Sequence, residues 1–252
     1  MTRRGRLLLF AGGALGVGIL LGFALAGLPG FHGPLGPSAE LVRNGVLGQR
    51  KTTNSVIAVT FDYRSLDTLG EEFILFVAAV GAVVLLRAQR GEDEDELAAE
   101  LTERRQARRT DLPRAVGVGL APATVLLGLY IVSHGHLSPG GGFQGGVIVA
   151  APLLFAFVAG RRFVMRGARP HALVELAEAA GAAGFALVGV GGLLLGAVFL
   201  DNFLPKGAQG DLLSGGTIPL SNLSVGLEVT GALVLILSEL LEQVVLRGGD
   251  RS

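Results

Sequence analysis

Five carboxylic acids within or beside long apolar runs are the side chains of this sequence best suited to chemistry. They are Glu228, Glu239, Glu178, Asp67 and Glu71. A charged carboxylate is costly where water is scarce, so an acid in such a place is usually paired or takes part in ion movement. The sequence therefore predicts these acids as candidates for an ion path, and the elements that hold them must position them for it.

The last apolar run holds three acids that share one face of a helix. At 100° per residue, Glu239 and Glu242 both lie within about 40° of Glu228 around the helix. Glu228 and Glu239 are nevertheless about 16 Å apart along the axis, and Ala232 and Leu235 lie between them. That gap is too wide for direct proton hopping without water. Glu239 and Glu242 also stand near the end of the run, where interfacial acids are ordinary.

The remaining candidates have structural alternatives too. Glu175 and Glu178 lie near one end of the fifth apolar run, which also suits interfacial acids. Asp67, Glu71 and Glu72 crowd the start of the second run, where a carboxylate can cap a helix and is favoured by the helix dipole. Both roles stay open for each acid, and no run contains an interior lysine.

Composition restricts the class of protein. Half of the 252 residues are hydrophobic, 17% are charged and the mean hydropathy is +0.57, whereas soluble domains carry about 25% charged residues. The absence of cysteine excludes disulfides, thiolate metal sites and thiol catalysis. No nucleophile–base pair, metal cluster or cofactor motif is visible. The sequence predicts an integral membrane protein that is not an enzyme, with a lipid bilayer but no nucleic acid among its partners and no cofactor.

Six membrane-spanning helices are expected, since uncharged runs of this length cross a bilayer. They cover residues 7–28, 73–87, 115–132, 143–160, 172–200 and 222–246, and the second run begins near Leu69. With the amino terminus inside, 16 of the 21 lysines and arginines fall on the inner side and 5 on the outer side. This asymmetry predicts an all-α membrane protein with both termini in the cytoplasm.

The first apolar run has a second interpretation. Basic residues, an apolar stretch and Ala24-Leu25-Ala26 resemble a cleavable signal peptide. The apolar stretch is about twenty residues long, which exceeds a usual signal core and favours an uncleaved helix.

A charged segment divides the chain. Residues 91–112 change from acidic to basic, and Glu100 stands four positions before Arg104, a spacing that supports a helix. The expected organisation is a two-helix module at 1–90, a cytoplasmic linker helix at 91–112 and a four-helix module at 113–252.

Residues 133–150, SHGHLSPGGGFQGGVIVA, contain the densest cluster of unusual residues. A dinucleotide loop would need a preceding strand and a ribose-binding acid about 20 residues later, and neither is present. Two histidines at i, i+2 without a third ligand do not make a zinc site, so they are expected to cap the preceding helix or to face interfacial water. A tight turn packed against a neighbour, or a surface that docks further subunits, explains the stretch better. Its candidate residues are His134, His136, Pro139, Gly140, Gly141, Gly142, Phe143, Gln144, Gly145 and Gly146.

Two stretches of the second module resemble a known family. HGHLSPGGGFQGGVIVA (134–150) is similar to a signature of the B subunit of Mrp (Mnh) multisubunit sodium/proton antiporters. Asn202-Phe203-Leu204 with LSGGTIPLSNLSVGLEV (213–229) resembles that subunit's second signature, and the resemblance covers roughly residues 112–246. In the first module, FDYR (61–64) and LDTLGE (66–71) resemble the carboxyl-terminal two-helix part of the family's A subunit, also found in membrane-bound hydrogenases. Tyr63-Arg64-Ser65 stands where that pattern usually reads Phe-Arg-Gly.

The resemblance implies a non-catalytic subunit, formed by fusion of the two modules, in a bacterial or archaeal plasma membrane. Its partners would be the remaining subunits of an Mrp-type antiporter, and Na⁺ and H⁺ would be the transported ions. Two alternatives stay open: a membrane-arm subunit of a hydrogenase or another complex-I-like assembly, and a self-sufficient transporter or channel.

The charge asymmetry makes a topology prediction. Because the chain has no cysteine, the single substitutions Arg4→Cys, Glu96→Cys and Arg251→Cys can be labelled specifically. All three cysteines should be protected from an impermeant thiol reagent in intact cells and should react after the membrane is opened. Labelling of Glu96→Cys from outside would rule out the six-helix topology.

Overall fold

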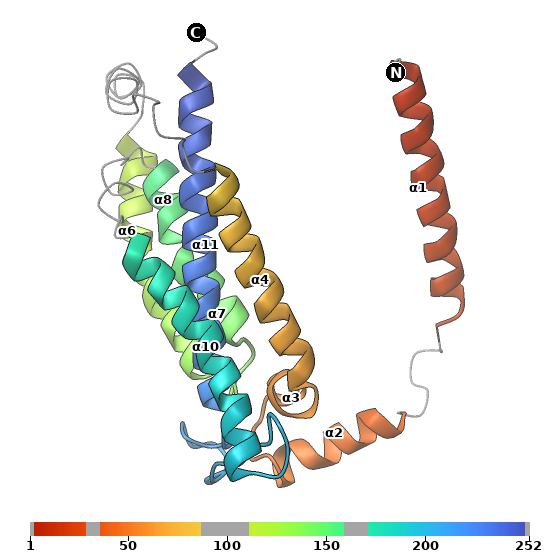
Figure 1. The fold of residues 1–252 in the computed structure, drawn as a ribbon, viewed down its shortest axis with the longest axis vertical. Helices are drawn as coiled ribbons and strands as arrows, with labels where there is room; N and C mark the ends of the chain where they lie inside the picture. The colour runs from red at the N-terminus through yellow and green to blue at the C-terminus, as the bar shows by residue number, and fades with distance from the viewer. Residues whose placement is uncertain (1–2, 29–35, 87–110, 159–170, 250–252) are drawn as a thin grey trace. The chain divides into compact units, whose positions relative to one another are not determined.

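The computed structural model describes residues 3–28, 36–86, 111–158 and 171–249, and these ranges contain helices, turns and loops but no strand (Figure 1). The chain divides into two compact units, Met1–Leu41 and Val42–Ser252. The linker helix predicted for residues 91–112 lies outside the described residues except for its last two positions, where the next helix already begins.

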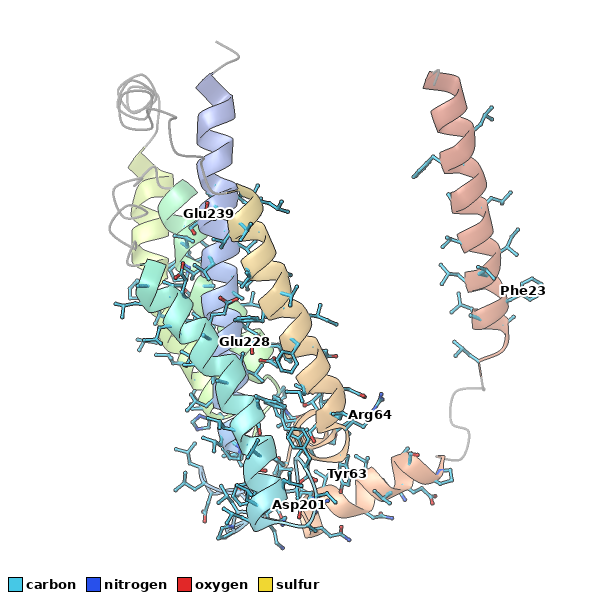
Figure 2. The ribbon with its side chains drawn as sticks, viewed as in Figure 1. Phe23, Tyr63, Arg64, Asp201, Glu228 and Glu239 are labelled. Carbon is cyan, nitrogen blue, oxygen red and sulfur yellow. The ribbon has the colours of Figure 1, made fainter. Side chains whose placement is uncertain are left out.

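Helix α1 (Arg3–Ala26) forms most of the first unit. Phe23 points away from the helix axis (Figure 2). Phe10 and Phe23 are each 76% exposed, as expected for a helix that meets lipid or another chain. Helix α2 (Pro37–Gly48) follows and was not expected, because its polar and apolar residues are mixed. It begins in the first unit and ends in the second.

Helix α11 (Ile218–Gly249) is the central element of the second unit (Figure 1). Its neighbours are α4 (Ser65–Leu86), α6 (Asp111–Ser133), α7 (Gly142–Ala150), α8 (Pro152–Val158) and α10 (His171–Leu195). Small residues cover the buried face of α11, among them Ser221, Ser224, Gly231 and Ala232, because small side chains let helix backbones approach closely.

The integral membrane class and the all-helical fold are confirmed for the described residues. Three helices are long and apolar enough to cross a bilayer: Ser65–Leu86, Ala172–Leu195 and Ile218–Leu241. Three shorter apolar helices lie at Phe10–Ala26, Gly119–Ser133 and Gly142–Phe155. Each predicted span overlaps one of these six segments. The number of complete crossings and the side of each terminus stay predictions.

Several helix ends differ from the predicted spans. Helix α4 begins at Ser65 instead of near Leu69, and Ser65, Thr68 and Glu72 of its first turns are buried in protein. The fourth span is broken between α7 and α8, where Pro152 begins a new helix. Helix α10 ends at Leu195 instead of residue 200, because the chain reverses and Asp201 accepts a 2.8 Å hydrogen bond from the backbone of Ala197.

A short segment before α4 joins both parts of the second unit. Helix α3 (Ser55–Ala58) continues into η1 (Val59–Tyr63), a π-helical turn. Phe61 of this turn packs on Phe185 of α10, with ring centroids 6.0 Å apart. Ile57, Ile218 and Val225 belong to the same buried cluster. Residues on both sides of the charged segment therefore share one core.

Asp62 connects the FDYR motif to the second signature of the following module. It lies 3.0 Å from Arg50 in an ion pair and accepts a 2.7 Å hydrogen bond from the side-chain amide of Asn202. Asn202 also donates to the carbonyl of Gly215 at 2.9 Å and accepts from the backbone of Thr217 at 2.8 Å. With 5% of its side chain exposed, Asp62 is a buried charge whose partners all lie within the chain.

Removal of this buried charge should destabilise the chain far more than removal of an exposed one. Asp62→Ala leaves Arg50 and Asn202 without their partner, a change that costs about 3–5 kcal/mol when a buried pair is broken. Asp67→Ala is the matched control, because the Arg64–Asp67 pair is mostly exposed and such pairs contribute about 0–1 kcal/mol. In detergent, the apparent melting temperature of Asp62→Ala should fall by roughly 10 °C. Equal melting temperatures for the two variants would contradict this role.

Candidate functional site: carboxyl groups between three helices

Glu228 lies in the middle of the second unit (Figure 2). It stands ten residues after Ile218, the first residue of α11, and therefore about 15 Å into the helix. The predicted span, which begins at Asn222, places it only about six residues in. Its side chain is completely buried. Among the described residues neither carboxyl oxygen meets an N–H or O–H donor.

Glu72 of α4 is the group that faces Glu228. It is 1% exposed, and its carboxyl group interacts electrostatically with that of Glu228 where α4 packs against α11. Ser65, Thr68 and Ala79 are buried on the same helix, so a small and polar stripe of α4 faces protein while its large apolar residues face outward. This stripe is the sequence signal that identifies Glu72.

Two predicted site residues of α4 are not part of this arrangement. Asp67 is exposed and pairs with Arg64, and Glu71 is exposed one position before Glu72. The cause is the 100° turn between successive residues, which sends Glu71 outward and Glu72 toward α11. Asp67 and Glu71 therefore do not join the buried carboxyl groups, and a role for them in an ion path stays a prediction.

Glu178 of α10 brings a third carboxyl group to the site. It is 2% exposed, one of its carboxyl oxygens has no hydrogen-bonding partner among the described residues, and its charge acts on Glu228. Glycines allow this approach. A Cβ added to Gly181 would collide with the backbone of Glu228, and one added to Gly231 would collide with Glu178. Helices α10 and α11 therefore touch backbone to backbone beside the acids.

Glu239 lies further along α11, toward its carboxyl end (Figure 2). It is 5% exposed, so it is not the ordinary interfacial acid that the sequence allowed. Glu178 lies at the level of Gly231, one turn from Glu228 and about 12 Å along the axis from Glu239. Between Glu228 and Glu239, α11 itself carries no acid, and residues such as Ala232 and Leu235 lie there. Glu178 of α10 lies beside this part of α11. The side chain of Glu242 lies outside the described residues.

The glycine stretch is a packed turn, as predicted. Gly140 has a φ of 128°, in the region that favours glycine. Asn54 donates through its side-chain amide to the carbonyls of Gly135 at 2.7 Å and Ser138 at 2.9 Å. The backbone amides of Thr53 and Asn54 donate to the carbonyl of His136 at 3.1 and 3.2 Å. The segment before α3 therefore binds this turn.

Asn222 of α11 holds the opposite side of the turn. It accepts a 2.6 Å hydrogen bond from the backbone of Gly142 and donates to the carbonyl of Val132. Gly145 and Gly146 have no room for a side chain, because a Cβ would meet Gly128 and Val132 or Gly226 and Val229. These contacts lie within this chain. The stretch thus packs against helices of its own chain. A role in assembly with further subunits stays a prediction.

The two histidines of the turn have different surroundings. The ring of His134 stacks on Tyr130 with centroids 4.2 Å apart and is half-buried. His136 is fully buried, so the expectation that it caps a helix or faces interfacial water was wrong. Burial lowers the pKa of its imidazole, which lies against the backbone of Asp211 and Leu212, and it therefore stays neutral at physiological pH. Pro139 and Gln144 are exposed, and Phe143 packs against the shared core.

The arrangement suits proton exchange better than metal binding or bond-making chemistry. Among the residues that the structure describes, no three histidine, aspartate or glutamate side chains are placed to hold a metal ion. A bundle of apolar helices with ionisable groups buried between them defines the chain as a membrane protein of the ion-handling class.

The family follows from comparison with known proteins. Residues 112–235 match the family described as a domain related to the MnhB subunit of Na⁺/H⁺ antiporters, and this part of the chain belongs to that family. An uncharacterized protein of Methanocaldococcus jannaschii is 31% identical over 204 residues, which cover 71% of this chain and 74% of that protein. A protein of Rhizobium meliloti, named as a probable A/B subunit of a K⁺/H⁺ antiporter, is 30% identical over 214 residues, which cover 77% of this chain and 21% of that longer protein.

Two solved complexes contain similar chains. A chain of the membrane-bound sulfane sulfur reductase, an archaeal respiratory membrane complex, matches with a TM-score of 0.70 and 28% identity over 94% of this chain and 98% of that chain. A chain of the Mrp complex from Dietzia sp. DQ12-45-1b matches with a TM-score of 0.73 and 26% identity over 100% of this chain and 27% of that chain. Both likenesses are to subunits of larger membrane assemblies.

Packing at the turn predicts the effect of Gly141→Val. A Cβ at Gly141 would collide with Ile57, and overpacking of this kind costs about 1–3 kcal/mol. The isolated variant should melt at a lower temperature in detergent, and less of it should enter the complex on native gels. Gly70→Val is the matched control, since a Cβ at Gly70 meets no atom within 4 Å. Normal stability with altered Na⁺ affinity would instead make this turn an ion-handling site.

Proposed function

We propose that the chain is a non-catalytic subunit of a multisubunit cation/proton antiporter that couples Na⁺ efflux to proton uptake. The observation that carries the proposal is the match of residues 112–235 to the MnhB-related family, in a chain whose apolar helices bury Glu72, Glu178 and Glu228. A subunit of this kind makes and breaks no covalent bond of a substrate, and its work is to bind its partners and to carry ions. Its place is in the plasma membrane of a bacterium or archaeon.

The extent of the similarity supports a fusion of two modules. The Rhizobium meliloti relative carries both letters, A and B, in its name, and its similarity covers 77% of this chain, more than the family match to residues 112–235 can account for. Residues 1–90 would be the part that corresponds to the end of an A subunit. The long subunits of such an antiporter are the partners that we propose for the exposed apolar faces of α4 and α10.

A second candidate function has its own support. The similar chain in the archaeal respiratory complex is matched over 98% of its length, so the same scaffold also serves complexes driven by redox chemistry. In that setting the chain would be a membrane-arm subunit of a complex-I-like assembly.

Purification of the assembled complex separates the two functions. An affinity tag on this chain should recover long antiporter-like subunits, and everted vesicles with the full subunit set should show Na⁺-dependent proton exchange that is lost when this chain is omitted. Recovery of cysteine-rich iron–sulfur or nickel subunits would favour the redox complex. Na⁺ movement by the chain alone in liposomes would show a self-sufficient transporter instead.

A further inference from the structure

We infer that Glu72 and Glu228 form a single proton-binding site built from both modules, and that Glu178 exchanges the proton with it. The inference rests on the proposed function and specifies which ion this chain handles. Glu72 comes from the part before the charged segment, whereas Glu178 and Glu228 come from the part after it. The site exists only where α4, α10 and α11 meet.

The surroundings of the Glu72–Glu228 pair require a proton. An ionised carboxylate only accepts hydrogen bonds, so two facing carboxyl groups can form one only if one of them is protonated. Both groups are buried, and among the described residues no N–H or O–H donor from any further residue reaches them. Two adjacent buried negative charges would repel each other and lose their hydration. One shared proton removes half of that charge and supplies the missing hydrogen bond.

The charged groups around the pair also favour a bound proton. They are acidic as well: Glu178 faces Glu228 from α10, and Glu71 acts on Glu72 from its own helix. Within the described ranges no lysine or arginine forms an ion pair with Glu72, Glu178 or Glu228. The described lysines and arginines therefore do not neutralise the pair, so we assign this role to a proton.

The oxygen atoms near the pair do not favour Na⁺. Hard cations bind where several oxygen ligands converge. Within the described chain no cluster of three acids or histidines can hold a metal ion. Two buried carboxyl groups with neither an N–H or O–H donor nor a basic side chain beside them in the described residues fit a proton site.

Glu178 is placed to receive this proton. It lies one turn from Glu228 toward the carboxyl end of α11, and one of its carboxyl oxygens is buried without a partner in the described structure. In the transfer step, the O–H bond of the Glu72–Glu228 pair breaks and an O–H bond forms on the carboxylate of Glu178. The total charge of the three groups does not change, but the transfer leaves adjacent carboxylates on Glu72 and Glu228, and their repulsion favours uptake of the next proton by the pair.

The test combines conservative substitutions with an infrared measurement on the purified complex. Glu72→Gln, Glu228→Gln and Glu178→Gln keep the shape of each side chain and remove its acid. Glu175→Gln and Glu40→Gln are the controls, because both residues are exposed, the first on the helix that carries Glu178 and the second on α2. Complex abundance is measured in parallel, and a complex that lacks this chain reports whether the chain is needed at all.

We expect each of the three buried substitutions to leave assembly intact and to lower Na⁺-dependent proton exchange by about a hundredfold, the order lost when a group that transfers a proton is removed. Glu72→Gln/Glu228→Gln should be no slower than the slower single variant, because the two residues share one proton. The wild-type complex should show the carbonyl stretch of a protonated carboxylic acid, and the double variant should lose that band. The controls should match wild type.

Three outcomes would overturn the inference. They are full exchange at every pH in normally assembled Glu72→Gln and Glu228→Gln, persistence of the carboxylic acid band in the double variant, and displacement of that band by Na⁺ at constant pH, which would make the pair a cation site. The proposed function fails separately, if omission of the whole chain leaves exchange unchanged.

Discussion

Close approach of α11 to its neighbours is the constraint on which the rest of the structure depends. Gly181 and Gly231 bring α10 and α11 into backbone contact, while Gly142 and Gly146 do the same for α7 and α11. In lipid, helix association is driven by such packing more than by the hydrophobic effect. The same proximity buries the acids that these helices carry. The close helix packing at these glycines and the burial of Glu228 therefore have one cause.

Sequence reasoning succeeded where few residue types satisfy a physical requirement. The turn at residues 138–142 needs positive φ and close packing, and glycine is almost the only residue that allows both. A tight turn could therefore be predicted from the sequence. The class of protein was equally readable, because apolar runs long enough to cross a bilayer are rare in soluble domains. The position of Glu228 within such a run likewise indicated that it is buried, whereas its part in an ion path stays a prediction.

The sequence-based predictions failed where a polar residue is buried by a segment that is distant in the sequence. By hydropathy, Ser65, Thr68 and Glu72 belong to the water-exposed start of a membrane helix, but all three are buried in protein. His136 was placed at the interface on the same argument, although Thr53 and Asn54 bind its backbone and the chain near Asp211 covers its ring. Burial by a segment distant in sequence cannot be predicted from the hydropathy of a single helix. For α4 the signal was the small and polar stripe, which in a membrane marks the face turned toward protein.

The contacts between residues 42–86 and residues 111–249 include a buried charge with its hydrogen bonds, a bound turn and aromatic packing, so the two parts recognise each other through surfaces of their own. Carrying them on one polypeptide changes the association from a bimolecular encounter to an intramolecular one, at an effective concentration that a short connection raises into the millimolar range or so. Equal numbers of the two parts are then guaranteed by a single translation event. Covalent continuity thus controls stoichiometry and assembly rate, while the noncovalent surfaces determine geometry.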